Sequence, residues 1–319
     1  VNPLRGVRAT FGGTPLIDGA DGRNGAAAGG ESPLVSVVLL THNKAGYTQR
    51  CLEGLLATPH RPFELVVFDN GSEDTTPALL DDFERRFGEK RLAFKRLRSK
   101  ENVGAVAGRN QAMARAEGEL FVFLDNDVVP RTRSWMGRLA AYLRGHPDVG
   151  AVGPKMVYPT EPHLIQCAGC DVSPTGRVWF RGRGEPRDAA EFCVERECQA
   201  LISACWMMPA AAVRVIGPLD EGFSPVQFED IDYCYRLREA GYRVVYLPDV
   251  EMYHFENVTT GRTGRLNYRY LTVKNGLRFK NKWRRRFSRE DGPPEESMRW
   301  REDIPEARLE EIGELETVP

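Results

Sequence analysis

The chain of 319 residues carries 44 basic and 45 acidic side chains, and 41% of its residues are hydrophobic. This balance excludes a chain that is basic throughout and binds nucleic acid along its length, and it also excludes an acidic, aromatic-poor disordered chain. No apolar run reaches the roughly 18 residues that a membrane-spanning helix needs. No basic segment followed by an apolar one lies near residue 1, so we expect no signal peptide.

The cysteines indicate a reducing compartment. There are seven, an odd number, and they are spread over the chain. This argues against a disulfide scaffold, and we therefore expect a cytoplasmic protein. A zinc site could draw on Cys167, Cys170, Cys193, Cys198 and His163. We favour the alternative, in which these cysteines are small buried side chains.

The first part of the chain predicts alternating strands and helices. Residues 1–32 contain eight glycines and no apolar periodicity, which indicates a flexible arm. From Val35 onward, continuous apolar runs predict buried strands and 3.6-residue spacing predicts helices between them. The expected strands are 35–41, 63–68, 93–97 and 119–124, and the expected helices are 47–56, 76–87, 105–116 and 135–143.

This alternation predicts an α/β fold with a mostly parallel sheet covered by helices. The second half of the chain is less regular. We expect strands at 150–157, 176–180 and 243–247, a helix at 228–240, and buried core over 200–216.

Polar residues follow three of the expected strands. Segments 41–43 (THN), 69–72 (DNGS) and 125–127 (DND) each come directly after a buried run. Ligands bind at the carboxyl ends of the strands in such a sheet. Carboxylates there can hold a base or a ribose, or can bind Mg²⁺ together with phosphate oxygens. Each segment alone could be a turn or a helix cap, but the three together favour a ligand site.

A glycine-containing segment at 102–110 (NVGAVAGRN) connects an expected strand to an expected helix. Gly104 and Gly108 would let the backbone approach a ligand closely, and Arg109 could meet a phosphate or a carboxylate. The segment is neither a dinucleotide-binding fingerprint nor a Walker loop.

The C-terminal part divides by charge. Segment 278–289 has seven basic residues interleaved with Phe279, Trp283 and Phe287, and segment 290–319 has eleven acidic and three basic residues. The basic segment has three interpretations. It could lie on an anionic membrane surface, form a solvated helix face, or balance the charge of the acidic tail.

Taken together, five segments resemble the family 2 glycosyltransferases. They are VSVVLLTHN (35–43), FDNGSEDTT (68–76), ENVGAVAGRNQAMARAEGELFVFLDNDV (101–128), VGPKMVYP (152–159) and FEDIDYCYRLREAGYRVVYLPDVEMYH (228–254). The later block resembles the rhamnosyltransferase-like branch. The resemblance implies the GT-A fold, a Rossmann-like, three-layer nucleotide-diphospho-sugar transferase fold with a mostly parallel central sheet.

With this resemblance we expect three regions. They are a Gly-rich arm over 1–32, a glycosyltransferase domain over 33–275 and a charged extension over 276–319. Within the domain, 33–130 would form the nucleotide-sugar half and 150–260 the acceptor half. The resemblance implies inverting transfer of a sugar from a nucleoside diphosphate donor, UDP- or dTDP-linked by preference, with Mn²⁺ or Mg²⁺.

Site residues are carried over by position from the family motifs. Asp127 would be the direct metal ligand, Asp125 would hold ribose or a metal-bound water, and His254 would complete the metal site. Asp230, with Glu229 second, would be the general base that takes the proton of an acceptor hydroxyl. The nucleoside would meet Thr41, Asn43, Asp69 and Ser72, and the rest of the donor site would be Asn102, Gly104 and Arg109.

Several alternatives stay open at this point. Glu229 and Asp230 could be acids that stabilise a helix N-terminus, and Asp232 competes for the role of base. The function could instead be that of a sugar nucleotidyltransferase or of a non-catalytic nucleotide-sugar-binding module. The acceptor could be a glycan, a lipid-linked glycan or a small molecule. We expect no nucleic-acid partner, and peripheral membrane contact through 278–289 is one possibility.

Overall fold

A computed structural model of the chain describes residues 32–256, 267–298 and 308–319. The predicted arm lies outside these residues, except for Ser32. The described residues belong to one compact unit, Ser32–Pro319.

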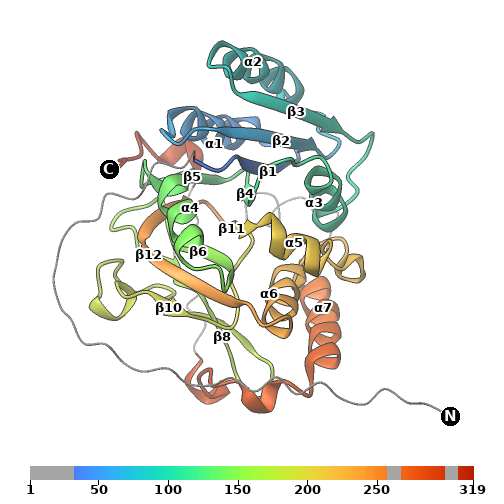
Figure 1. Cartoon of the computed structure of the whole chain (residues 1–319), viewed down its shortest axis with the longest axis vertical. Helices are drawn as coiled ribbons and strands as arrows, with labels where there is room; N and C mark the ends of the chain where they lie inside the picture. The colour runs from blue at the N-terminus through green and yellow to red at the C-terminus, as the bar shows by residue number, and fades with distance from the viewer. Residues whose placement is uncertain (1–31, 257–266, 299–307) are drawn as a thin grey trace, which may run out of the picture. The chain divides into compact units, whose positions relative to one another are not determined.

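A ten-stranded sheet forms the centre of this unit. Figure 1 shows how its main strands are arranged. Its strands follow the order β10-β12-β6-β11-β4-β1-β2-β3, while β5 pairs with β12 and β7 pairs with β6. The neighbours β3, β2, β1 and β4 are parallel, and so are β6 and β12, whereas β11 is antiparallel to β4 and β6. The predicted mostly parallel sheet is thus confirmed. The strands are Val35–Thr41 (β1), Phe63–Asp69 (β2), Ala93–Arg98 (β3), Leu120–Asp125 (β4), Val128–Pro130 (β5), Val149–Val157 (β6), Ile165–Cys167 (β7), Arg196–Glu197 (β10), Cys205–Pro209 (β11) and Arg243–His254 (β12), with a separate hairpin of Cys170–Val172 (β8) and Val178–Phe180 (β9).

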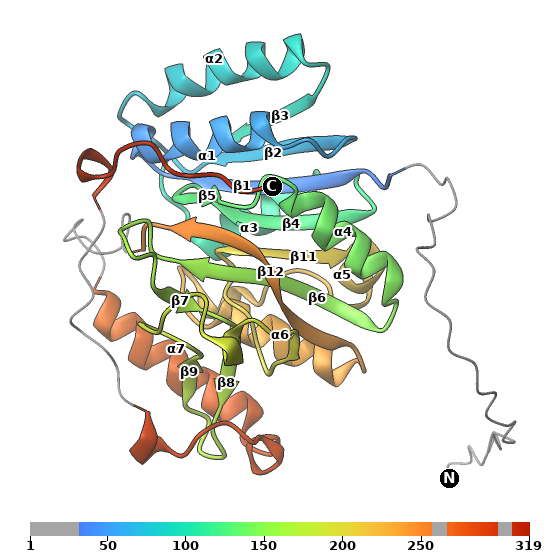
Figure 2. The ribbon, with the colours of Figure 1, turned by 90° about the vertical axis from the view of Figure 1, so that its left-hand side faces the viewer.

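Helices cover both faces of the sheet. Figures 1 and 2 show α1 and α4 on one side and α3, α5 and α6 on the other, with α7 outside α6. The apolar faces of these helices complete a core in which β1, β2 and β4 are almost entirely buried. No helix among the described residues is long and apolar enough to cross a membrane. The helices are Ala45–Ala57 (α1), Thr76–Glu89 (α2), Ala105–Met113 (α3), Trp135–Gly145 (α4), Ala210–Ile216 (α5), Glu229–Glu239 (α6) and Tyr268–Trp283 (α7).

The carboxyl ends of three central strands meet at one edge of the sheet. Thr41 pairs in register with Asp69, and Leu40 pairs with Asp125. The polar segments that follow β1, β2 and β4 are therefore neighbours, as their position after buried runs predicted.

Strand β12 is longer than predicted and reaches the same edge. We expected a strand over 243–247, but β12 continues to His254. The register against β6 shifts between Leu247 and Glu251, and this irregularity accommodates Pro248, which cannot donate to a ladder. The far end of β12 then pairs with β5, placing His254 opposite Val128.

The aromatic residues of the basic segment 278–289 face the protein. Phe279 and Phe287 are buried, and their rings contact each other and the ring of Tyr235 on α6. Trp283 also packs on Tyr235 and donates its indole N–H to Asp232. These three aromatic side chains are therefore not the membrane contact that we considered, because they form the interface between α7 and α6.

Three of the seven basic residues of this segment form ion pairs with the body of the protein. Arg278 and Lys282 bind Asp220, and Arg286 binds Glu239. The described part of the acidic tail pairs elsewhere, for example Glu290 with Arg238 on α6. α7 also continues across residue 275, where we expected the glycosyltransferase domain to end.

The last described segment, 308–319, lies against β5 and α1. Leu309 donates its backbone N–H to the hydroxyl of Tyr47, and Glu316 forms an ion pair with the buried Arg131. Val318 exchanges backbone hydrogen bonds with Arg131 and Arg133. This end of the chain therefore supports the part of the sheet that carries β5.

Candidate active site

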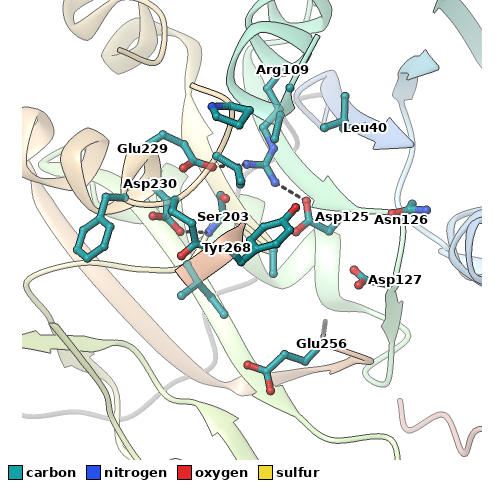
Figure 3. A pocket seen from close by; sticks show the side chains of 18 of the residues that line it. Leu40, Arg109, Asp125, Asn126, Asp127, Ser203, Glu229, Asp230, Glu256 and Tyr268 are labelled. Carbon is teal, nitrogen blue, oxygen red and sulfur yellow. Dashed lines mark hydrogen bonds and ion pairs between the residues drawn. The ribbon is translucent and has the colours of Figure 1, made fainter. Parts of the chain in front are cut away.

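A cavity of about 310 Å³ opens at the carboxyl ends of β1 and β4. Figure 3 shows its lining, to which β4, the N-terminal ends of α3 and α6, and the first residue of α7 contribute. Eight of the twelve predicted site residues line it, namely Asn102, Gly104, Arg109, Asp125, Asp127, Glu229, Asp230 and His254.

Asp125, Asp127 and His254 form a group that could hold a metal ion, because their ligand atoms all lie within 4.8 Å of one another. The topology explains the grouping. Asp125 ends β4, Asp127 precedes β5, and the pairing of β5 with the end of β12 brings His254 alongside. Two carboxylates and one imidazole form a donor set that suits Mn²⁺ or Mg²⁺, and the residues present therefore fit a divalent cation.

A buried glutamine orients His254. The Nδ1 atom of His254 lies 2.7 Å from Oε1 of Gln166, and Nε2 lies 3.4 Å from Oδ1 of Asp127. This contact holds the ring so that its Nε2 atom faces Asp127. Burial opposes a charge on His254, but Asp127 outweighs burial and raises the pKa of the imidazole.

Arg109 connects the two ends of the cavity. It is 5% exposed, and its guanidinium donates to Asp125 on one side and to Glu229, at 3.0 Å, on the other (Figure 3). Burial alone would lower the pKa of Arg109, but Asp125 and Glu229 raise it. Arg109 therefore stays charged, and its forked guanidinium holds both carboxylates in place.

Glu229 and Asp230 begin α6 and are held differently. Glu229 is 2% exposed and is paired with Arg109, whereas Asp230 is partly exposed to the cavity. Asp230 accepts hydrogen bonds from the backbone N–H groups of Ser203, at 3.1 Å, and Ile231, at 2.8 Å. Burial raises the pKa of Asp230, and burial together with Asp230 raises the pKa of Glu229 to about 7. This arrangement leaves Asp230 as the accessible carboxylate.

Asp232, the competing candidate, faces away from the cavity. It is fully buried, accepts hydrogen bonds from Lys282 and Trp283, and forms an ion pair with Arg236. These partners use both carboxylate oxygens to fasten α7 to α6. The structure therefore gives Asp232 a packing role.

Asn70 organises the part of the cavity that Asn102 and Gly104 line. Its side-chain amide donates to Oδ1 of Asn102 and to the carbonyl of Gly104, and its Oδ1 accepts from the N–H of Val103. Gly104 has φ of +89°, and a Cβ atom there would lie 2.9 Å from the Cα atom of Pro225. Both the backbone angle and the close approach therefore require glycine.

Four predicted residues lie beside the cavity and do not line it. Asn43 donates its backbone N–H to the hydroxyl of Ser72, whose own N–H is bonded to Asp69. The hydroxyl group of Thr41 is hydrogen-bonded to the hydroxyl group of Thr48 on α1. These contacts join the segments after β1 and β2 to each other and to α1.

The sequence analysis missed several residues of the cavity. Gln166, Ser203 and Tyr268 line it, as does His42, whose Nδ1 lies 2.8 Å from the carbonyl oxygen of Asn70. Asn70 and His42 could have been found, because both belong to the polar segments at the strand ends. Gln166, Ser203 and Tyr268 follow no such pattern.

The cysteines do not form a metal site within the described residues. All seven are free thiols, and six of them are buried. Sγ of Cys167 lies 3.8 Å from Sγ of Cys170, but the described residues contain one metal-capable group, which is Asp125, Asp127 and His254. Six of the cysteines are small buried side chains, whereas Cys193 is exposed.

Comparisons with known proteins identify relatives. Residues 36–211 match the family described as Glycosyl transferase family 2. The chain is 29% identical to the O-antigen biosynthesis protein RfbC of Myxococcus xanthus, over 72% of this chain and 18% of the relative. It is 28% identical to N-acetylglucosaminyl-diphospho-decaprenol L-rhamnosyltransferase of Mycobacterium tuberculosis, over 72% of this chain and 78% of that one. Several relatives are much longer, and the chain spans 18% to 41% of their length.

A solved structure shares the architecture. The mannosyltransferase PcManGT of Pyrobaculum calidifontis, in complex with GDP-Man and Mn²⁺, superimposes with a TM-score of 0.58 at 19% sequence identity. The match covers 83% of this chain and 67% of PcManGT. At this identity the likeness concerns the fold.

Proposed function

Because the chain belongs to glycosyl transferase family 2 and has the GT-A fold, we propose that it is an inverting, metal-dependent glycosyltransferase. It would transfer a sugar from a nucleoside diphosphate donor, UDP- or dTDP-linked by preference, to an acceptor hydroxyl. One observation carries the proposal. A single cavity holds a metal-capable group, Asp125, Asp127 and His254, at one end and the accessible carboxylate of Asp230 at the other.

The donor end would bind the nucleotide sugar. We assign the nucleoside to the hydrogen-bonded segments after β1 and β2, which carry Thr41, Asn43, Asp69 and Ser72, and to Asn102 and Gly104 in the cavity. Since the first four do not line the cavity, binding through them requires the adjoining loops to rearrange around the nucleoside.

The metal-binding group would hold a divalent cation, Mn²⁺ or Mg²⁺. Asp127 and His254 would be direct ligands, and Asp125, held by Arg109, would contact ribose or a metal-bound water. When bound, such a cation offsets the negative charge that develops on a leaving diphosphate.

Asp230 would act as the general base. An acceptor hydroxyl is a weak nucleophile at neutral pH, and a carboxylate within hydrogen-bond reach can take its proton as the new bond forms. Asp230 suits this role better than Glu229, because Glu229 is committed to its ion pair with Arg109. Attack assisted by one base on the face opposite the leaving group inverts the anomeric centre.

The relatives support a glycan or lipid-linked acceptor. One is named for O-antigen biosynthesis and another for L-rhamnosyl transfer to a decaprenol-linked N-acetylglucosamine. We propose an acceptor of this class, with a small molecule as the alternative.

A thermal-shift and turnover panel tests the proposal. UDP-, dTDP- and GDP-sugars are added with Mn²⁺ or Mg²⁺ to the unaltered protein and to Asp127→Ala and Asp230→Asn, with the exposed Asp188→Asn as matched control. A donor at 100 times its Kd stabilises the protein by about 2.7 kcal/mol. We expect this shift to be lost in Asp127→Ala and retained in Asp230→Asn.

Turnover separates the roles of the two carboxylates. Asp230→Asn should lower transfer about 10²- to 10⁴-fold while leaving donor binding intact. If no nucleotide sugar shifts the melting temperature and no donor is hydrolysed, the proposal is wrong. Formation of a nucleotide sugar from a nucleoside triphosphate and a sugar phosphate would instead identify a nucleotidyltransferase.

A further inference from the structure

The outward face of α7 is unusually apolar for a solvent-exposed helix. Five large hydrophobic side chains are strongly exposed among the described residues, and three of them lie on α7. Tyr270 is 62% exposed, Val273 59% and Leu277 57%. Their spacing of three and four residues places them on one side of the helix, opposite the buried Leu271 and Phe279. Figure 1 shows α7 at the edge of the molecule, outside α6.

This apolar stripe lies in the most basic part of the chain. Residues 257–289 contain eleven basic side chains and no acidic one. Arg278 and Lys282 point back to Asp220, but Lys274 is exposed on the same side as Tyr270 and Leu277. Within the part of the chain that the structure describes, neither Arg269 nor Lys274 has a carboxylate at ion-pair distance.

We propose that the outward face of α7, formed by Arg269, Tyr270, Val273, Lys274 and Leu277, docks on an anionic lipid surface. An apolar stripe flanked by lysine and arginine is the composition of helices that lie in the membrane interface. The apolar side chains enter the boundary of the acyl chains, and the basic ones meet the lipid phosphates.

Charge argues against the other occupants of this face. Residues 1–31 carry three basic and three acidic side chains, and residues 299–307 carry two basic and three acidic ones, so neither segment offers strong complementarity. A second copy of the chain would bring one basic face against another, because a two-fold interface pairs the same surface with itself. An anionic bilayer offers acyl chains to the apolar residues and phosphates to the basic residues.

Docking through α7 has a consequence for the cavity. Tyr268, the first residue of α7, lines the cavity, so a docked helix holds the cavity close to the lipid surface. The proposal itself does not depend on the transfer reaction, since it rests on the composition of α7.

The experiment is cosedimentation of the full chain with vesicles of phosphatidylglycerol and phosphatidylcholine, compared with phosphatidylcholine alone. Tyr270→Ser, Val273→Ser and Leu277→Ser are combined in one variant. Val215→Ser is the matched control, because Val215 is 66% exposed on α5. We expect the unaltered chain and the control to bind the anionic vesicles, and the triple variant to bind at least about tenfold more weakly. All are expected to melt at similar temperatures.

A second variant isolates the electrostatic contribution. Removing one basic residue near an anionic surface weakens binding about fivefold, so Arg269→Ala with Lys274→Ala should weaken it about 25-fold. Binding should also fall as salt is raised. Absence of binding to anionic vesicles, or equal binding by the triple variant and the control, overturns the proposal. Self-association of the unaltered chain that the triple variant abolishes also overturns it and assigns the face to a second copy. Donor-induced thermal shifts need no vesicles, so the proposed function can fail independently.

Discussion

Replacement of Arg109 by methionine tests the ion-pair network directly. The guanidinium is 5% exposed and lies 3.0 Å from Glu229, with Asp125 on its other side. At an effective dielectric constant of about 20, one charge pair at this distance interacts by about 5.5 kcal/mol before the cost of desolvation. Measured losses on breaking a buried pair are about 3–5 kcal/mol, because an uncompensated charge stays buried. We expect Arg109→Met to lower the free energy of unfolding by this amount.

Urea denaturation followed by circular dichroism measures the effect. A loss of 3–5 kcal/mol should lower the urea midpoint by about 1 M or more. Arg115→Met is the matched control, since Arg115 is exposed just beyond α3, and its effect should stay within about 0.5 kcal/mol.

A double variant identifies the cause of the loss. Glutamine at 229 needs no counter-charge, so Arg109→Met with Glu229→Gln should recover about 0.5–3 kcal/mol relative to the sum of the two single effects. An Arg109→Met protein within 1 kcal/mol of the unaltered chain would refute the reasoning, and so would strict additivity in the double variant.

Three further predictions concern the pH profile, the metal-binding group and α7. Burial and Asp230 raise the pKa of Glu229 to about 7, so kcat/KM should increase with pH through this region as Glu229 loses its proton and pairs with Arg109. Glu229→Gln has no proton to lose and should remove this limb, and a limb that persists in the variant contradicts its assignment to Glu229. Gln166→Leu should raise the Kd for Mn²⁺, measured by calorimetry, about 10- to 100-fold, because His254 loses its orienting partner. An unchanged Kd would contradict this role of Gln166. Phe279→Ala should lower the free energy of unfolding, measured by thermal unfolding, by about 3–5 kcal/mol, because Phe279 is buried. The control Val273→Ala should lower it by less than about 0.5 kcal/mol, because Val273 is exposed. Equal losses in the two variants would contradict the buried face assigned to α7.

Strands β1, β2 and β4 of the parallel half could be predicted from the sequence because they are buried on both faces. Each such strand is a continuous apolar run, and its carboxyl end is marked by the first polar residue. Asp69 and Asp125 were placed at neighbouring strand ends for this reason, and the register confirms it. The family and the fold that the motifs suggested are also confirmed.

The antiparallel half carries no comparable signal. β5 and β7 have three residues each, too few for a periodic pattern. Periodicity alone therefore could not place His254, which lies beside Asp127 because β5 pairs with the end of β12; its place next to Asp127 was expected only from the family resemblance. Gln166 lies on β7, and its contact with His254 spans 88 positions of the chain.

The sequence pattern indicated which side of α7 faces the protein, but the surrounding charged residues favoured another interpretation. Phe279, Trp283 and Phe287 are spaced by four residues, which places them on one side of a helix and predicts that they pack together. The surrounding arginines and lysines favoured a surface interpretation. The structure separates two stripes, aromatic residues toward α6 and Tyr270 and Leu277 toward solvent.

The role of Arg109 shows why a site residue can be found without its function being understood. Its position in a glycine-containing segment at the start of a helix suggested contact with a phosphate or a carboxylate of a ligand. In the structure, both ends of its guanidinium are already bound by Asp125 and Glu229, 16 and 120 residues away. Because Glu229 is paired with Arg109, Asp230 is the carboxylate that is exposed to the cavity. The two adjacent acids therefore have different environments. The same guanidinium thus connects Asp125 at one end of the cavity to the acid pair at the other, and a substitution at Arg109 should disturb both ends at once.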